Sequence, residues 1–252
     1  MAKEGKKITD YCDYVNTLDN TPYDVDKDYV YGKYQFSDEE IDYYDKIDLK
    51  IKNYSNSEKF KNEINKIALW KINRFIDFKD PEEAKKELIK LIDEYDKPDH
   101  GNLKKEIEEI AETKGKLNLP KNNVYCVLND YLDREKVKGI RLAMLSTILR
   151  FYMPEVFPII DVRAYRSSWA LYYKKNPNEY EKYYGKNEAD KLKPRPITES
   201  NRVQEYCRYI QRCQTLISMI DNPKIKTMED IDKYLYGIDD KGNWNIDSSL
   251  IR

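Results

Sequence analysis

The feature that most limits the fold of this 252-residue chain is a succession of helix patterns along nearly its whole length. Apolar residues recur at every third or fourth position, and Ser, Thr, Asp or Pro often stands where such a pattern begins. The expected helices cover residues 37–54, 57–78, 81–95, 102–112, 122–132, 140–152, 161–173, 198–220 and 227–236. Strand signals are few, and the best is a poor one at residues 29–36. The sequence therefore predicts an all-α protein.

Composition excludes several classes of protein. Hydrophobic residues make up 40% of the chain and charged residues 36%, an apolar share that is too large for a disordered chain. No apolar run reaches the roughly 18–20 residues that cross a bilayer. The Lys-rich residues 1–10 precede no apolar stretch, so we expect no signal peptide and no membrane partner. The four cysteines show neither metal-ligand spacing nor a dense disulfide pattern, which favours a reducing cytoplasm.

The chain contains a single histidine, His100. A zinc site, a Cys-His pair or a Ser-His-Asp triad therefore has almost nothing to be built from. Any catalysis is expected to depend on carboxylates, lysines, tyrosines or an ion. We expect neither a cofactor nor a metal site built from protein ligands, and a monomeric protein.

Charge is distributed unevenly, although the net charge is only −1. Residues 1–48 hold 6 basic and 13 acidic residues (6 − 13 = −7), whereas residues 134–214 hold 17 basic and 9 acidic residues (17 − 9 = +8). Nine of the 11 arginines lie between residues 134 and 212. Since Arg makes forked contacts with phosphate, this distribution indicates a nucleic-acid partner. The alternative is ordinary fluctuation of charge along a Lys- and Glu-rich chain.

Residues 136–169 carry the strongest functional signal. We expect Gly139 to lie in a turn directly before an apolar helix, where backbone N–H groups can hold a phosphate and a glycine lets it approach. Lys138 and Arg141 flank this turn. About twenty residues later, an apolar stretch ends at Asp161, which we expect to cap the next helix.

The helix expected after Asp161 adds further candidates for contacts with DNA and with the base. Arg163 and Arg166 are three residues apart and share a helix face, so we expect both to contact DNA. Tyr165 lies one turn beyond Asp161.

This segment resembles the helix-hairpin-helix superfamily of DNA glycosylases, which includes the 8-oxoguanine and adenine-mismatch glycosylases. The family has a glycine-containing hairpin that grips a DNA phosphate, followed about twenty residues later by an aspartate that opens a helix. Here the spacing is 161 − 139 = 22, and residues 160–163 read Ile-Asp-Val-Arg, like the family's apolar-Asp-apolar-basic signature. The run over residues 142–166 looks most like small bacterial glycosylase-like proteins, some of which act in defence against phages with modified bases.

The hairpin departs from the family pattern in two ways. Residues 137–141 read Val-Lys-Gly-Ile-Arg, without the proline and second glycine of the usual Leu-Pro-Gly-Val-Gly. Bifunctional members carry a Schiff-base lysine four residues after the first hairpin glycine, and Ala143 stands there. The resemblance thus implies a monofunctional enzyme rather than a β-lyase.

The resemblance also implies a two-lobed fold with a cleft between the lobes. Residues 1–50 would form an acidic, Tyr-rich arm that packs with the C-terminal lobe. Residues 51–160 would form one helical lobe with the hairpin at 136–152, and residues 161–252 the other, beginning at the catalytic Asp161. The partner would be double-stranded DNA with a damaged or modified base.

A flipped base needs pocket walls, for which three groups of residues are candidates. Trp70, Lys71 and Arg74 lie together on the helix that begins at residue 57; alternatively Trp70 is a core residue and Lys71 reaches solvent along its stem. Tyr165 is a second candidate. Tyr206, Tyr209 and Gln211 lie on the last long helix; alternatively these tyrosines form an aromatic core stripe.

The chemistry suits these residue types. Cleavage of an N-glycosidic bond builds positive charge on the sugar, and a fixed carboxylate beside that carbon stabilises it. The helix dipole favours the ionised form of Asp161. The alternative is that Asp161 only caps its helix, which is worth about 1 kcal/mol.

The sequence thus predicts a monofunctional DNA glycosylase acting in repair or phage defence. A non-catalytic helical module that binds DNA or a protein partner is the alternative. A lyase that uses Lys71 or Lys138 is a weaker third candidate.

Overall fold

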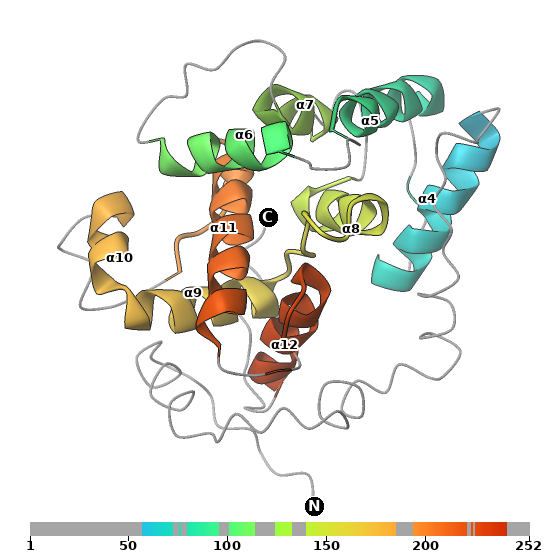
Figure 1. Cartoon of the computed structure of the whole chain (residues 1–252). Helices are drawn as coiled ribbons and strands as arrows, with labels where there is room; N and C mark the ends of the chain where they lie inside the picture. Colours follow the sequence, from blue (N-terminus) through green and yellow to red (C-terminus); the bar gives the residue numbers. More distant parts are fainter. Residues whose placement is uncertain are drawn as a thin grey trace, which may run out of the picture. The chain divides into compact units, whose positions relative to one another are not determined.

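The structure is a computed structural model that describes residues 57–72, 76, 80–95, 101–113, 124–132, 140–184, 194–220, 223 and 225–240 (Figure 1). Nine helices make up most of this part, which confirms the all-α prediction. Seven of them begin and end within four residues of the expected bounds. The helix expected at 37–54 and the strand pattern at 29–36 lie outside the described residues.

The chain divides into two units, of which the larger contains the helices before residue 159 and the start of helix α11. Its helices are α4 (Ser57–Ile72), α5 (Pro81–Tyr95), α6 (Gly101–Glu112), α7 (Val124–Tyr131) and α8 (Leu142–Tyr152). Helix α4 packs against α5 and α8, and α7 packs against α5 and α6. The core of this unit holds, among others, Phe60, Ile64, Leu145 and Ile148, each fully buried.

The second unit contains residues Ile160–Glu199 and the chain from Arg212 onward. Its helices are α9 (Val162–Lys175), α10 (Pro177–Tyr184), the end of α11 (Arg202–Met219) and α12 (Met228–Asp240). Helix α9 packs against both α10 and α12. Trp169 of α9 is fully buried, and its ring centroid lies 4.7 Å from that of Tyr184 on α10. The Tyr- and Lys-rich region around α10 is therefore partly joined to the core through aromatic contacts.

Side-chain caps explain where several helices begin. The Asp80 carboxylate accepts a hydrogen bond from the Glu83 amide (3.0 Å) in front of Pro81, which suits the first position of α5. Thr227 and Asp230 form a reciprocal capping box at the start of α12. The Thr227 amide donates to the Asp230 carboxylate (N to O 2.9 Å), and the Asp230 amide donates to the Thr227 hydroxyl oxygen (3.2 Å). Helix α7 is capped from another helix, because Glu106 of α6 accepts from the Val124 amide (2.8 Å).

The described helices include none that is both long enough and apolar enough to span a membrane.

Candidate active site

Asp161 is the N-cap of α9, as the sequence predicts. Its backbone is extended (φ −130°, ψ 176°), and its Oδ1 accepts a hydrogen bond from the Ala164 amide at 2.9 Å. The residue is half-buried, so the carboxylate is held by the helix start but is not sealed inside the protein. A group with this combination of fixed geometry and partial access can stabilise a cation that approaches it.

The approach to Asp161 is apolar and buried, as the sequence also predicts. Phe157 and Ile160 are fully buried, and Ile159 is 8% exposed. A turn after α8 sets the direction of this stretch, because the amides of Val156 and Phe157 both donate to the Met153 carbonyl at 3.0 Å. The carboxylate therefore follows directly on a stretch of buried chain.

The start of α8 carries Arg141 where α9 carries an aspartate. The Arg141 backbone is extended (φ −111°, ψ 173°), its carbonyl accepts from the amides of Met144 and Leu145 at 2.9 Å, and its side chain is exposed. The Arg141 side chain makes no capping hydrogen bond to this helix start. Lys138 and Gly139, the other expected phosphate contacts, lie outside the described residues.

Arg163 and Arg166 in the first turns of α9 differ in exposure. Arg163 is half-buried, whereas Arg166 is only 7% exposed. We predicted both as DNA contacts because of their spacing on one helix face. Of the two, Arg163 has the accessibility that a phosphate contact needs, and the burial of Arg166 is that of a packing residue.

Burial extends to other arginines of the basic segment. The structure describes eight of the nine arginines between residues 134 and 212. Four of these are buried: Arg150, Arg166, Arg208 and Arg212. Only Arg141 and Arg195 are exposed, and the other two are half-buried. Four of the 17 basic side chains that the sequence places in residues 134–214 are thus buried.

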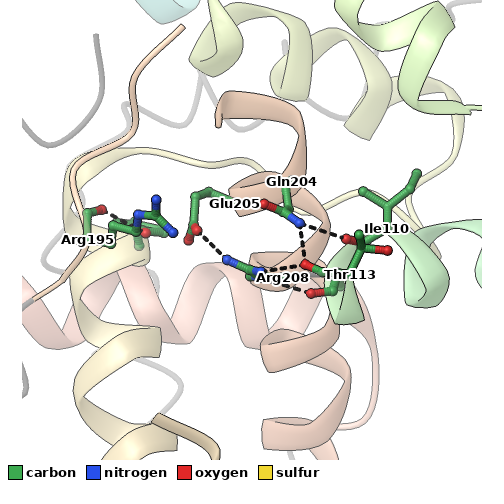
Figure 2. A network of polar contacts seen from close by, with 8 residues as sticks. Ile110, Thr113, Arg195, Gln204, Glu205 and Arg208 are labelled. Carbon is green, nitrogen blue, oxygen red and sulfur yellow. Dashed lines mark hydrogen bonds and ion pairs between the residues drawn. The ribbon is translucent and has the colours of Figure 1, made fainter. Parts of the chain in front are cut away.

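Arg208 shows what an internal arginine does in the larger unit. Its Nη1 lies 2.8 Å from Oε1 of Glu205, which is fully buried, and its Nε and Nη2 donate to the carbonyls of Ala111 and Thr113 at 2.9 and 3.0 Å. Gln204 donates to the same Thr113 carbonyl at 2.6 Å (Figure 2). These side chains of α11 satisfy the last carbonyls of α6, a role that charge counting did not reveal.

Arg212 has aromatic neighbours in the second unit. Its guanidinium carbon lies 5.2, 5.0 and 5.7 Å from the ring centroids of Tyr165, Trp169 and Tyr173 on α9. Its Nε donates to the Ser168 hydroxyl at 3.4 Å. Cation–π contacts of this kind stabilise a charge that has left water.

The base-pocket candidates separate into two groups. The side chains of Trp70 and Lys71 on α4, and all of Arg74, lie outside the described residues. Tyr165, Tyr206 and Tyr209 are fully buried, and Gln211 is half-buried.

The buried tyrosines use their hydroxyls within the protein. Tyr165 donates to the Arg195 carbonyl at 3.0 Å. Tyr206 donates to the Pro158 carbonyl at 2.9 Å, and Tyr209 to the Ile159 carbonyl at 3.2 Å. For Tyr206 and Tyr209 this is the core placement given above as the alternative to base contact.

The described cysteines also differ in burial. Cys207 and Cys213 of α11 are buried free thiols, and Cys126 of α7 is a half-buried one. Burial raises the pKa of the Cys207 thiol far above its usual range. Cys207 therefore stays protonated near neutral pH and is not a nucleophile.

Within the part of the chain that the structure describes, no group of three or more His, Cys, Asp or Glu side chains is placed to hold a metal ion. Comparisons of the chain with protein-family models, curated proteins and solved structures found no match.

Proposed function

We propose that the protein is a monofunctional DNA glycosylase that removes a damaged or modified base by hydrolysis of its N-glycosidic bond. The observation that carries this proposal is the half-buried Asp161 carboxylate, fixed at the start of α9 behind a buried apolar stretch. The likeness of residues 136–169 to the helix-hairpin-helix glycosylases supplies the reaction class.

In this reaction Asp161 faces the sugar carbon from which the base departs. As the bond to the base stretches, positive charge grows on the sugar ring, and the carboxylate stabilises that charge. Because Oδ1 already accepts the Ala164 amide, the group keeps its position while the charge develops. The carboxylate also orients the water that completes the hydrolysis.

The start of α8 is the proposed phosphate grip. The Arg141 side chain does not cap the first-turn amides of this helix, and its exposed guanidinium adds a positive charge beside them. The proposal includes a two-lobed helix-hairpin-helix fold, with double-stranded DNA as the partner.

The decisive assay uses DNA duplexes that each contain one altered base, together with phage genomic DNAs that carry modified bases. After incubation with the protein, alkali converts abasic sites to strand breaks. We expect breaks at one class of base only after alkali, because position 143 is an alanine. A protein that leaves every DNA intact is not a glycosylase for the bases tested.

The burial of four arginines favours a second candidate, a non-catalytic helical module, because these side chains are used for packing rather than for a DNA surface. The two candidates differ in one measurement. A module binds DNA or a protein without producing abasic sites. Breaks without alkali, together with a borohydride-trapped adduct, would instead indicate a lyase that uses Lys71 or Lys138.

A further inference from the structure

Two tyrosines of α11 hold the stretch of chain that leads to Asp161. The hydroxyls of Tyr206 and Tyr209 donate to the consecutive carbonyls of Pro158 and Ile159, at 2.9 and 3.2 Å. Only Ile160 separates the second of these carbonyls from Asp161. Since residues 157–160 have no regular secondary structure, their carbonyls need partners other than a helix or a sheet.

The rings of the two tyrosines add a second contact to the same stretch. The Phe157 ring stacks on Tyr206 with a centroid distance of 6.2 Å and an interplanar angle of 19°. Tyr206 in turn stacks on Tyr209 at 6.5 Å and 21°. Both tyrosines are fully buried, so their ring faces are used inside the protein rather than offered to a base.

The part of α11 that carries these tyrosines is itself fixed. Gln204 and Arg208, which stand beside Tyr206 and Tyr209 along the helix, are hydrogen-bonded to the end of α6 (Figure 2). The two hydroxyl donors therefore stand on an anchored segment of helix. A donor that is held in this way can determine the position of its acceptor.

We infer that Tyr206 and Tyr209 are positioning residues for Asp161, which they hold through the backbone carbonyls of Pro158 and Ile159. This inference depends on the proposed glycosylase function. A misplacement of about 1 Å in a catalytic group costs on the order of a hundredfold in rate. The tyrosine hydroxyls thus contribute to catalysis without touching the DNA.

The test compares Tyr206→Phe, Tyr209→Phe and the double variant with the wild type. The substrate is the DNA duplex that the wild type cleaves best in the panel described above. The measurement is the single-turnover excision rate with enzyme in excess and at saturating concentration, because a partly unfolded sample then lowers the amplitude rather than the rate constant. The dissociation constant for the same DNA is measured in parallel.

We expect each single variant to lose about tenfold in the excision rate, and the double variant to lose more than either, while DNA affinity stays within about twofold. Tyr131→Phe is the matched control. Tyr131 is also buried in the larger unit, but its hydroxyl has no hydrogen-bond partner among the described residues. Loss of the Tyr131 hydroxyl should therefore leave the excision rate unchanged.

The outcomes separate the inference from the function. Unchanged excision rates in all three variants of an active enzyme overturn the positioning role and leave the glycosylase function in place. Weaker DNA binding with an unchanged excision rate also overturns the positioning role, because that result is expected if the tyrosines contact the DNA base directly. If the double variant does not fold, Tyr209→Phe, which removes the longer hydrogen bond, decides alone. A wild type that excises nothing removes the function, and the inference with it.

Discussion

The helices α8 and α9 begin with the same backbone geometry and opposite charges. The residue before each helix is extended, with φ and ψ of −111° and 173° at Arg141 and −130° and 176° at Asp161. Asp161 accepts a hydrogen bond from an amide of its own helix, whereas the Arg141 side chain makes no capping hydrogen bond to α8. The start of α9 is thus capped by its own N-cap side chain, whereas the start of α8 is suited to an external anion.

This difference separates stability from function. An N-cap that satisfies its own helix stabilises the fold, and it gains a catalytic role only if its carboxylate also reaches a substrate. A helix start with a cation in the cap position gives up that stabilisation, which is a cost that binding an anion can offset. Substitutions at the two cap positions should therefore separate effects on stability from effects on activity.

The largest effect is expected for Asp161→Asn. Asparagine caps a helix about as well as aspartate, but it removes the negative charge. We expect the excision rate to fall by about a thousandfold or more, with DNA affinity and the melting temperature nearly unchanged. Asp80→Asn, at the capped start of α5, is the matched control and should excise normally. Full activity of Asp161→Asn would reduce Asp161 to a structural cap.

The next effect is expected for Arg141→Asp, which gives α8 the kind of cap that α9 has. We expect DNA affinity to fall by about tenfold and the slope of its salt dependence to decrease by about 1. The free energy of unfolding should rise by about 1 kcal/mol, because the new carboxylate can accept a first-turn amide. Binding across a salt series and urea denaturation measure the two changes.

The control for Arg141→Asp is Lys104→Asp, the same charge change at an exposed position of α6. It should leave DNA affinity within about twofold and the salt slope nearly unchanged. If both variants weaken binding equally, the start of α8 has no special role, and general charge accounts for the affinity.

A smaller effect, on the free energy of unfolding, distinguishes the capping hydrogen bond of Asp161 from its negative charge. Asp161→Ala should lower the free energy of unfolding by about 1 kcal/mol, whereas Asp161→Asn should lower it very little. Thr227→Ala removes the cap of α12 and should cost a similar amount. Of the two alanine variants, only Asp161→Ala should also abolish excision. Equal stability of the alanine and asparagine variants would mean that the Ala164 hydrogen bond contributes nothing.

The smallest effect concerns the other end of α9. Burial, and then the nearby Glu179 carboxylate, raise the pKa of Tyr172 to about 12. A raised pKa means that folding favours the neutral phenol, so this contribution to stability is complete below about pH 10 and is lost as the pH rises towards 12. Tyr172→Phe should flatten the alkaline part of the stability curve. An unchanged curve would show that the phenol does not titrate in this range.

The helices and their caps could be predicted because they depend on local sequence. Asp161 before an apolar helix, and Thr227 three residues before Asp230, predict helix starts from spacing alone, and the structure has both. The extent of α4 was harder to predict, since its pattern continues to residue 78, whereas the described residue Ile76 is not helical.

The roles of the arginines and tyrosines could not be predicted from local sequence. The partners of Arg208 lie more than 90 residues away, at Ala111 and Thr113, and those of Tyr206 and Tyr209 about 50 residues away. A charged or aromatic residue looks the same in a sequence whether it points to solvent or to a distant carbonyl. The one local signal was the spacing of three between Glu205 and Arg208, which places them on one helix face.

The enclosed thiols of α11 have a practical consequence. Because Cys207 and Cys213 are buried, and the Cys207 thiol stays protonated, a maleimide dye at neutral pH should not attach beside the tyrosines that hold the path to Asp161. In a Cys12→Ser background, the half-buried Cys126 of α7 becomes the preferred attachment point. A fluorophore there can report DNA encounter while the proposed catalytic machinery remains unlabelled.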